Sequence, residues 1–543
     1  MKSLVLAVTG LLLSMSVSAH DIEVDGVCYK ILSEDAVSVT YRGTDPHDYS
    51  DEYSGAVNIP NSVTYADNQY RVVGIESYAF FGCSGLTSVE MPNNVISIGD
   101  NAFSDCPDLV SVEISNSVIY IGYGAFSGCS GLISIVVDDE NTYYDSREGC
   151  NAIIEKFSNT LIAGCQLTII PNSVTSIGFG AFSSCSGLPS VVIPNSVTSI
   201  GYGAFSGCSG LSSVVIPNSV TSIGDNAFEF CSCLSSVEIP NSVTSIGTSA
   251  FRYCSCLTSV EIPNSVSSIE QGVFSGCSGL ISVEIPNSVI SIGPSAFSGC
   301  SDLNSVKIPN SVTSIGYGAF DGCSGLISIV VDDENTYYDS REGCNAIIEK
   351  SSNTLIVGCQ STIIPNNVTS IGDVAFYGCS GLTSVVIPNS VTSIGTYAFY
   401  GCDSLTSVEI GSSVTSIWYG AFEFCYSLTN LISYAEEPPT CGLNTFERVV
   451  KENCVLRVPQ SCLAAYQQAD EWKDFFFIEE DVPTARGDVN DDGNINVVDV
   501  STVVSILLKS EYSKVADVNN DGKINVVDVS TIVSIILNQY QSE

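Results

Sequence analysis

Histidine is almost absent from this chain of 543 residues, which has only His20 and His47. A histidine-based catalytic triad or a zinc site with two histidine ligands therefore has almost no candidates. No HExxH, GxSxG or P-loop pattern is present either. Carboxylate-pair hydrolysis needs no histidine and stays open as an alternative. We nevertheless predict no enzyme, because every acidic residue of the repeats described below is explained by repetition or lies on a loop.

Positive charge is also scarce. Lysine and arginine number 18 against 59 aspartate and glutamate residues, which gives a net charge of −41 although charged residues make up only 14% of the chain. Such a chain is repelled by nucleic-acid phosphates and by anionic lipid surfaces. We therefore expect no nucleic acid as a partner, whereas cations and neutral ligands remain open.

Long apolar runs are missing beyond the start of the chain. The start carries Lys2, an apolar run from Leu4 to Leu13 and small residues before Ala19, which is the pattern of a secretory signal peptide over residues 1–19. The run is too short to anchor the chain, and no later segment reaches about 18 apolar residues. We expect a protein without a membrane span, exported in soluble form and either released or held at the cell surface. That compartment permits disulfides.

What the chain has in abundance is repetition. An Ala-Phe pair, with Val273 once in place of Ala, occurs thirteen times between Ala79-Phe80 and Ala421-Phe422, mostly at intervals of 23 residues. Two longer intervals, from Phe126 to Phe182 and from Phe320 to Phe376, hold insertions near 138–170 and 332–364. The insertions are near copies of each other, which indicates that a large block was duplicated whole.

Each unit, such as "LSSVVIPNSVTSIGYGAFSGC", predicts two short strands, "SVVIP" and "SVTSIG", followed by a tight turn. One unit cannot bury its Leu, Val, Ile and Phe side chains alone, whereas stacked units can. We therefore predict a mainly β leucine-rich-repeat solenoid of 23-residue coils with short helical turns. A small α-helical unit with EF-hand-like loops should follow it.

The pattern "IPNSVTSIGxxAFxGCSGL" resembles the BspA-like leucine-rich repeats of bacterial surface proteins. The stretches "IEVDGVCYKILSEDAVSVTY" and "EEPPTCGLNTFERVVKENCVLRVPQSCLAAYQQADEWKDFFFI" resemble that family's two caps. The resemblance implies an N-terminal cap at 20–74, a solenoid at 75–430, a C-terminal cap at 431–480 and a linker at 481–486. It also implies a binding scaffold at a cell surface, without naming its ligand.

Thirteen of the 23 cysteines lie three residues after the repeat Phe, from Cys83 to Cys425, which predicts a buried column of apolar thiols. Cys150 and Cys165 flank a predicted hairpin centred on Phe157-Ser158 and would face each other across its strands. Cys344 and Cys359 repeat this arrangement in the second insertion. Cys233 and Cys256 replace the Gly of "CSGL" in adjacent units, so these two should stack. Each pair could form a disulfide or remain as free thiols.

Two outward-facing columns are candidates for binding. A strand position carries glutamate in successive units, at Glu238, Glu261 and Glu284, and is either a stripe for a basic ligand or a solvated face. The position after "SIG" carries aromatic residues that could stack on sugars or anchor a protein, or could be ordinary exposed side chains. These residues are Tyr123, Phe179, Tyr202, Tyr317 and Tyr419, with Trp418 adjoining the last.

Two acidic loops near the C-terminus break the repetition, "GDVNDDGNINVVDV" at 487–500 and "ADVNNDGKINVVDV" at 516–529. Oxygen-bearing groups at alternating positions, with a glycine for the turn, match the twelve-residue calcium loop of an EF-hand, except that Asp replaces the closing Glu. We predict two Ca²⁺ ions, with backbone carbonyls supplied by Asn494 and Lys523. The predicted ligands are Asp488, Asn490, Asp492, Asn494, Asn496 and Asp499 in the first loop, and Asp517, Asn519, Asp521, Lys523, Asn525 and Asp528 in the second.

One helix should leave each loop and none should enter it. The helices are rich in β-branched residues, which have weak helix propensity, so we expect them to depend on the metal and on each other. This doubled unit at 487–538 resembles a type I dockerin, which implies calcium-dependent docking onto a cohesin module. By that resemblance the contacts are Val497, Val498 and Val504 and their duplicates Val526, Val527 and Val533.

The two halves are nearly identical, so either could dock. The Val-Val pair at the end of each loop replaces the polar pair common in cellulosomal dockerins, which leaves the class of partner open. An apolar pair still suits a contact surface, and the alternative is that these valines pack the two helices together.

We therefore expect a non-catalytic binding or adhesion scaffold. Its solenoid would bind an extracellular protein or glycan, and its tail would dock onto a cohesin-type partner. The alternative is an accessory subunit of an extracellular polysaccharide-degrading complex, in which the solenoid is structurally passive.

Overall fold

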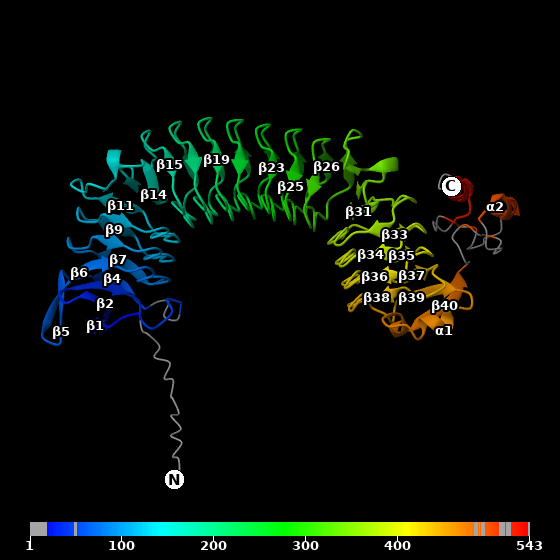
Figure 1. The fold of residues 1–543 in the computed structure, drawn as a ribbon, viewed down its shortest axis with the longest axis horizontal. Coiled ribbons are helices and arrows are strands. Elements are labelled where there is room, and N and C mark those ends of the chain that lie inside the picture. The colour runs from blue at the N-terminus through cyan, green and yellow to red at the C-terminus, as the bar shows by residue number, and fades with distance from the viewer. Residues whose placement is uncertain are drawn as a thin grey trace, which may run out of the picture. The chain divides into compact units, whose positions relative to one another are not determined.

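The computed structural model describes residues 19–47, 52–482, 487, 489, 495–509, 516, 518 and 523–540. The chain forms two compact units, which divide between Leu234 and Ser235. Coils of one repeat length stack one after another within each unit, as the ribbons of Figure 1 show.

A single coil follows directly from the repeat sequence. In β18 (Ser213–Val215) the side chain of Val214 is buried while that of Val215 is exposed, which is the alternation of a strand. Pro217 ends the ladder because it has no N–H to donate, and Val220 N–H closes a turn on its carbonyl at 3.0 Å. Each strand pairs in parallel with its counterpart one coil away, with Ser190 opposite Ser213.

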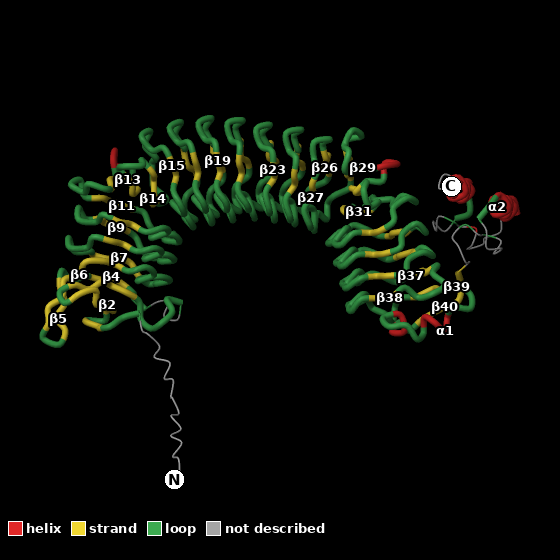
Figure 2. The backbone as a smooth tube through the Cα atoms, viewed as in Figure 1, coloured by secondary structure: helices red, strands yellow, loops and turns green. Residues whose placement is uncertain are grey.

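The Ala-Phe segment makes successive tight turns. In one coil Ser206 N–H donates to the Gly203 carbonyl at 3.0 Å, and Cys208 N–H donates to the Phe205 carbonyl at 3.1 Å. These segments are drawn as loops between the short strands in Figure 2. The helical turns expected from the sequence are therefore single turns, each closed by a hydrogen bond from one N–H to the carbonyl three residues earlier.

The first unit contains four sets of paired strands. The first begins with an antiparallel meander of β1 (Ile22–Val24), β2 (Val27–Ser33) and β3 (Ala36–Thr40). It continues in parallel through β6 (Asn68–Ile75), β8 (Ser97–Ile98) and β10 (Tyr120–Ile121), and β5 (Ser62–Tyr65) pairs antiparallel with β6. The second runs β11 (Ser134–Val137), β9 (Ser111–Ile114), β7 (Leu86–Glu90) and β4 (Gly55–Asn58). The third runs β12 (Tyr144–Asp145), β13 (Ala152–Glu155), β14 (Thr160–Gly164), β15 (Ser176–Ile177), β17 (Ser199–Ile200) and β19 (Ser222–Ile223). The fourth pairs β16 (Ser190–Val192) with β18.

The second unit repeats this plan. One sheet runs β20 (Ser236–Glu238), β22 (Ser259–Glu261), β24 (Ser282–Glu284), β26 (Ser305–Ile308) and β28 (Ser328–Val331), and another β23 (Ser268–Ile269), β25 (Ser291–Ile292) and β27 (Ser314–Ile315). A third runs β29 (Tyr338–Asp339), β30 (Ile347–Glu349), β31 (Thr354–Val357), β32 (Ser370–Ile371), β34 (Ser393–Ile394), β36 (Ser416–Ile417) and β38 (Thr440–Cys441). The last runs β33 (Ser384–Ile387), β35 (Ser407–Ile410), β37 (Asn430–Ser433), β39 (Val455–Pro459) and β40 (Phe477–Val482). One more short strand of this unit, β21, spans Ser245–Ile246.

Helices are few in the described chain. The short ones are η1 (Arg147–Gly149), η2 (Arg341–Gly343), η3 (Trp472–Asp474) and α1 (Leu463–Tyr466), and the longer ones are α2 (Val497–Lys509) and α3 (Val526–Tyr540). Near the C-terminal end of the coils, Trp472 packs edge-on against Phe446 and Tyr466 and is fully buried. The mainly β solenoid and the small helical region predicted from the sequence are thus confirmed.

The core is organised around the repeated phenylalanines. Phe205 is fully buried and stacks on Phe182 and Phe228, with ring centroids 5.0 and 5.2 Å apart. The column cysteines lie beside these rings, and Cys208 Sγ donates to the carbonyl of Phe182 at 3.0 Å. All thirteen column cysteines are buried, as the sequence predicted.

Each insertion adds a hairpin to a sheet rather than projecting away from it. In the first, β13 and β14 pair antiparallel around a turn centred on Phe157-Ser158, and β14 then pairs in parallel with β15. A β-bulge between Ile153 and Ile154 shifts the register by one residue. The second insertion has the same bulge, between Ile347 and Ile348.

The bulge corrects one expectation, because Cys150 and Cys165 are not directly opposite. Ala152 pairs with Gly164, so Cys165 lies across from Asn151, and its Sγ donates to the Asn151 carbonyl at 3.5 Å. All 23 cysteines are free thiols in this structure. Disulfides between Cys150 and Cys165, Cys344 and Cys359, or Cys233 and Cys256 therefore stay predictions.

Candidate functional site

The two C-terminal helices begin in the same way. At the start of α2, Val498 N–H donates to Asn496 Oδ1 at 2.9 Å, and Asn496 N–H donates back to Asp499 Oδ2 at 2.9 Å. This reciprocal pair is a capping box, with Asp in the position that Glu or Gln usually takes. At α3 the same bonds link Val527 to Asn525 and Asn525 to Asp528, both at 2.8 Å.

The closing carboxylates are buried. Asp499 and Asp528 are each 0% exposed, and Asp499 Oδ1 also accepts a bond from Val489 N–H at 2.7 Å. A buried carboxylate is stable only with hydrogen bonds or a cation beside it, so these two residues suit the last ligand position of a calcium loop. The Asp that replaces Glu therefore caps its helix, and its role as the last calcium ligand stays a prediction.

Five of the twelve predicted calcium ligands fall within the described residues, namely Asn496, Asp499, Lys523, Asn525 and Asp528. The side chains of Asn496 and Asn525 are half-buried beside the closing aspartates, and Lys523 is exposed. The other seven lie outside the described residues: Asp488, Asn490, Asp492, Asn494, Asp517, Asn519 and Asp521.

The interior between the two helices is made by residues other than the predicted contact valines. It consists of Val489, Ile495, Val503, Ala516, Val518, Ile532 and Ile536. Val497 and Val526 are each 72% exposed, and Val498 and Val527 are each 48% exposed. Val504 is half-buried and Val533 is exposed. Because both loop-end Val-Val pairs are exposed, packing between the helices does not account for them.

Two exposed leucines lie on the same helices as the predicted contact valines, and sequence reasoning missed them. Leu508 is 80% exposed and its duplicate Leu537 is 57% exposed. Leu508 follows Val497 and Val504 at spacings of eleven and four residues, which places all three on one face of α2. Applying the helical spacing to the sequence could therefore have identified both leucines.

The thiol column has a role beyond filling space. Cys106, Cys208 and Cys231 donate to the carbonyls of the repeat phenylalanines one coil earlier, at 3.0 to 3.2 Å. Burial raises the pKa of Cys231 to about 12 and the pKa of Cys208 well above its ordinary value. These thiols therefore stay protonated. Each one is a second donor to a phenylalanine carbonyl that already accepts a backbone N–H within its own coil, so the thiol adds a hydrogen bond between neighbouring coils.

We expect alkylation under native conditions to separate the two kinds of cysteine. Iodoacetamide should label Cys233 and Cys256, which are exposed, and leave Cys208 and Cys231 unlabelled until the chain is unfolded. Peptide mass spectrometry reads out the labelling, and the same unreduced digest shows whether Cys150 is joined to Cys165. Labelling of the column cysteines in the folded protein would contradict this account.

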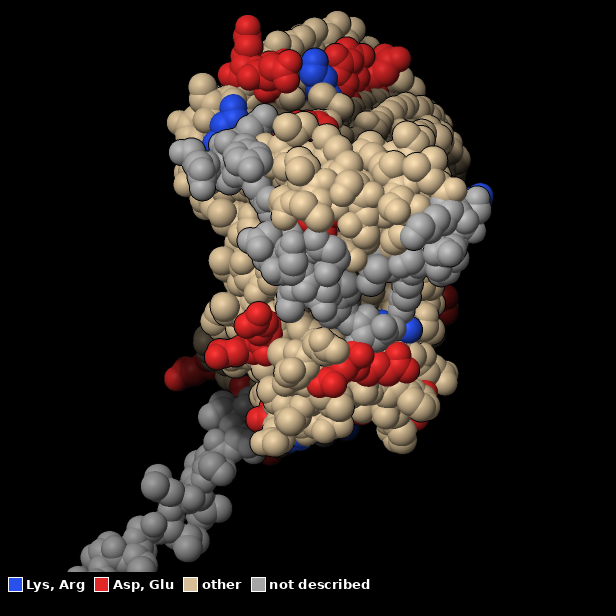
Figure 3. Space-filling model, turned by 90° about the vertical axis from the view of Figure 1, so that its right-hand side faces the viewer, with Lys and Arg blue, Asp and Glu red and all other residues tan. Residues whose placement is uncertain are grey.

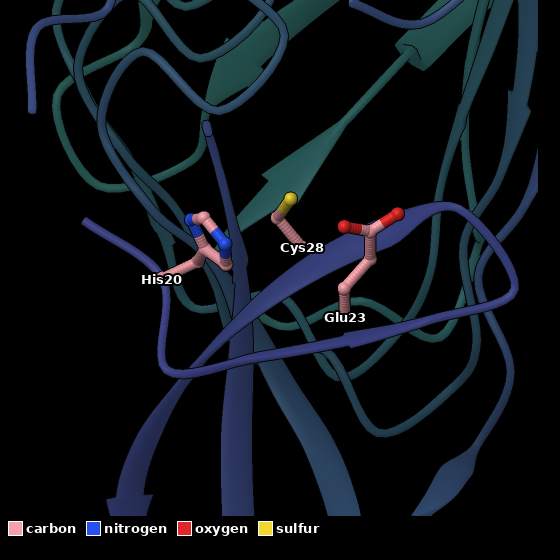
Figure 4. Close-up of side chains that lie close together, drawn as sticks. All are labelled: His20, Glu23 and Cys28. Atoms are coloured by element: carbon pink, nitrogen blue, oxygen red, sulfur yellow. The ribbon is translucent and has the colours of Figure 1, made fainter. Parts of the chain in front are cut away.

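Within the described residues, one group of three side chains has metal-ligating atoms within 4.8 Å of one another, His20, Glu23 and Cys28, shown in Figure 4. Its partners argue for a structural role. Glu23 forms an ion pair with Arg42 at 3.0 Å, and Cys28 Sγ donates to Glu52 Oε1 at 3.2 Å. Burial and the hydrogen bond to Glu52 raise the pKa of Cys28 to about 12, which disfavours the thiolate that a metal requires.

The outward columns are exposed as predicted, except at Glu409, which takes the same strand position as Glu238 in a later coil but is buried and accepts a hydrogen bond from the Tyr434 hydroxyl. Tyr123, Phe179 and Tyr202 form a ladder in the first unit, with ring centroids 5.7 and 4.9 Å apart. Glu238, Glu261 and Glu284 are exposed on the strand face of the second unit. On the face drawn in Figure 3, acidic residues gather in several patches while lysine and arginine are few. None of the helices in the described part of the chain has the length and apolar character of a membrane span.

Comparison with known proteins agrees with both parts of the molecule. The family model "BspA type Leucine rich repeat region" matches residues 56–160, 155–281, 268–354 and 346–456, and the model "Dockerin type I domain" matches residues 486–537. Both matches confirm the resemblances found in the sequence. No curated protein matches the chain.

Several solved structures are similar. A leucine-rich repeat protein from Bacteroides ovatus is 28% identical, and the match covers 85% of this chain and 100% of that one, with a TM-score of 0.44. A leucine-rich cell surface protein from Faecalibacterium prausnitzii is 24% identical over 85% of this chain and 94% of that one, with a TM-score of 0.40.

Proposed function

Because this chain belongs to the BspA-type leucine-rich repeat family and carries a type I dockerin domain at 486–537, we propose that it is an exported, non-catalytic scaffold. The tail docks onto a cohesin-type partner, and the solenoid binds a protein or glycan outside the cell. Two Ca²⁺ ions, one in each loop, hold the docking surface in shape. The protein is either released or kept at the bacterial cell surface.

The observation that carries the docking proposal is the exposure of the apolar loop-end pairs. Val497 and Val498 match Val526 and Val527 in their exposed fractions, 72% and 48% in both halves. Exposed apolar pairs at equivalent positions of two near-identical halves support two equivalent contact surfaces, one in each half. Either half therefore suffices for docking.

A second candidate function is an accessory subunit of an extracellular polysaccharide-degrading complex, in which the solenoid only spaces other parts. The dockerin match favours it, since dockerins typically attach such subunits to a scaffold. The two candidates differ in what is retained with the protein. Polysaccharide-degrading enzymes would co-purify in the second case, and a surface protein or glycan would be retained by the solenoid in the first.

Docking is tested with the immobilised full chain and the secreted and envelope proteins of the producing organism, with calcium or with a chelator. We expect a cohesin-bearing protein to be retained only with calcium. Changing Val497 and Val498 to Ser, or Val526 and Val527 to Ser, should weaken binding by less than about fivefold, because the other half substitutes. The fourfold variant should lose at least about thirtyfold, at roughly 1 kcal/mol or more for each of the two contact valines of whichever half docks.

The matched control is Val192→Ser, because Val192 is 82% exposed and lies on a solenoid strand. It should leave docking unchanged. Retention of the same partner by the fourfold variant, or retention that survives the chelator, would remove the support for this docking surface.

A further inference from the structure

A cavity of about 670 Å³ lies in the second unit, where the second insertion joins the coils near the label β31 in Figure 1. That volume is within the range of small-molecule sites. Three aromatic and three acidic residues supply the side chains that could hold a ligand: Tyr317, Tyr377, Trp418, Asp321, Glu349 and Asp373. Tyr317 and Trp418 are 61% and 56% exposed, so their rings are open to a ligand.

The duplicated block provides an internal comparison. In the first copy the corresponding column is a closed ladder, in which Phe179 packs against Tyr123 and Tyr202. In the second copy a carboxylate replaces this phenylalanine, and a second carboxylate and a tyrosine replace serines. The equivalent pairs in the two copies are Phe179 and Asp373, Ser127 and Asp321, and Ser183 and Tyr377.

The charges of the cavity are all of one sign. Among the described residues no lysine, arginine or histidine lines it, and Asp321, Glu349 and Asp373 form no ion pair. Asp373 accepts one bond from Thr396 N–H at 2.7 Å, and Glu349 accepts one from Ser352 Oγ at 2.5 Å. Burial raises the pKa of Asp321 to about 7, so an incoming positive charge would stabilise the ionised form of this carboxyl.

The aromatic side chains lie close to these carboxylates. Burial raises the pKa of Tyr317, and the nearby charges of Asp321 and Asp373 raise it further. The pKa of Tyr377 is likewise raised by burial and then by Asp321. Tyr317, Tyr377, Asp321 and Asp373 all line the cavity, so these phenol rings and carboxylates face a common space.

The three carboxylates of the cavity do not gather around one point. Their oxygen atoms do not converge as the ligands of one ion must, since among described residues only the cluster at His20 meets that spacing. Negative charge spread over walls that also carry aromatic faces suits a larger cation with an apolar body. Such a cation gains from both the carboxylates and the ring quadrupoles.

We propose that this cavity binds a protonated organic amine, either a free diamine or the amine of a lysine side chain on a partner. The amine lies between Asp321 and Asp373, and its methylene chain packs on Tyr317, Tyr377 and Trp418. The site is independent of the docking tail. It gives the solenoid a ligand of stated chemistry in only one of the two duplicated blocks.

Titration calorimetry of the full chain tests this proposal with matched probes. Cadaverine and N-acetyl-lysine-N-methylamide represent the two sources of the amine, and 1,5-pentanediol is the neutral counterpart of cadaverine. We expect at least one amine to bind with a submillimolar Kd and the diol to bind at least tenfold more weakly. The amine that binds more tightly identifies the source.

The duplicated block supplies the variants. Asp373→Phe and Asp321→Ser introduce the residues that the first copy carries and folds with, and each should weaken amine binding at least tenfold. Asp403→Asn removes an exposed charge outside the cavity and should change binding by less than twofold. Equal binding of diol and diamine, unchanged binding in the two variants, or no detectable amine binding at millimolar concentrations would overturn the proposal.

Amine binding should also depend on pH. Because the pKa of Asp321 is about 7, most of this carboxyl is protonated at pH 6 and ionised at pH 8, while the amine stays charged. The affinity for cadaverine should therefore rise up to tenfold between pH 6 and pH 8. The titratable groups whose pKa Asp321 raises are Tyr317, Tyr377 and Cys323, and Glu349 and Asp373 line the same cavity. Asp321→Ser is therefore needed to assign the change and should remove it. A pH dependence that persists in this variant would contradict the role given to Asp321.

Discussion

Replacing Phe205 with alanine should lower the free energy of unfolding of the first unit by about 3–5 kcal/mol, the usual cost of emptying a buried aromatic site. The ring is fully buried and touches a ring on each side, at 5.0 and 5.2 Å. The stacked neighbours cannot collapse into the space, because each is held in its own coil. Two interfaces therefore lose packing through one substitution.

Urea unfolding followed by circular dichroism in the far ultraviolet measures this loss. The matched control is Phe157→Ser, since Phe157 is 99% exposed and the duplicated insertion carries Ser351 at the same place. The control should shift stability by less than about 0.5 kcal/mol. Similar midpoints for the two variants would mean that the phenylalanine ladder does not hold the coils together.

Removing calcium should unfold the C-terminal helices and leave the coils intact. The interior between α2 and α3 is small, and the helices consist largely of valine and isoleucine, so they have little stability of their own. A ligand at 100 times its Kd stabilises the folded state by about 2.7 kcal/mol, which is enough to decide whether such a unit folds. Without the ion, buried Asp499 and Asp528 would keep their backbone hydrogen bonds but lose the positive charge beside them.

Hydrogen exchange by mass spectrometry resolves this response along the chain. With a chelator, peptides from 497–509 and 526–540 should exchange at least tenfold faster, and peptides from 190–228 should not change. Magnesium in place of calcium should fail to restore protection. Asp499→Ala should expose α2 more than α3, and Asp528→Ala the reverse. Full protection in the chelator would show that the tail folds without metal.

The regular parts of the molecule could be predicted because repetition averages out local ambiguity. A strand of three residues such as β18 has almost no signal alone, but thirteen copies at one phase determine which residues face inward. The buried cysteine column followed from the same phase, whereas its hydrogen bonds did not. A thiol that donates to a carbonyl of the preceding coil depends on how two coils align, and no single unit reveals this.

The irregular parts were the ones that sequence reasoning missed. The bulge between Ile153 and Ile154 comes from fitting the hairpin against a parallel neighbour, so counting residues from the turn placed Cys150 wrongly opposite Cys165. The cavity near Asp373 depends on three substitutions in two coils, which are noticed only when the two copies of the block are compared. The calcium ligands differ from both, since they were predicted from the spacing within twelve consecutive residues, and they stay a prediction.

The constant pairing offset has a genetic consequence. Ser190 pairs with Ser213, and Ser259 with Ser282, so each coil offers its neighbour the same strand edge and the same ring at every step of the repeat. Loss or gain of the codons of one whole unit, or of several, therefore rejoins matching surfaces. The length of the solenoid can change by recombination between repeats without a new interface having to arise, and the cavity of the second block can be copied or lost as one piece.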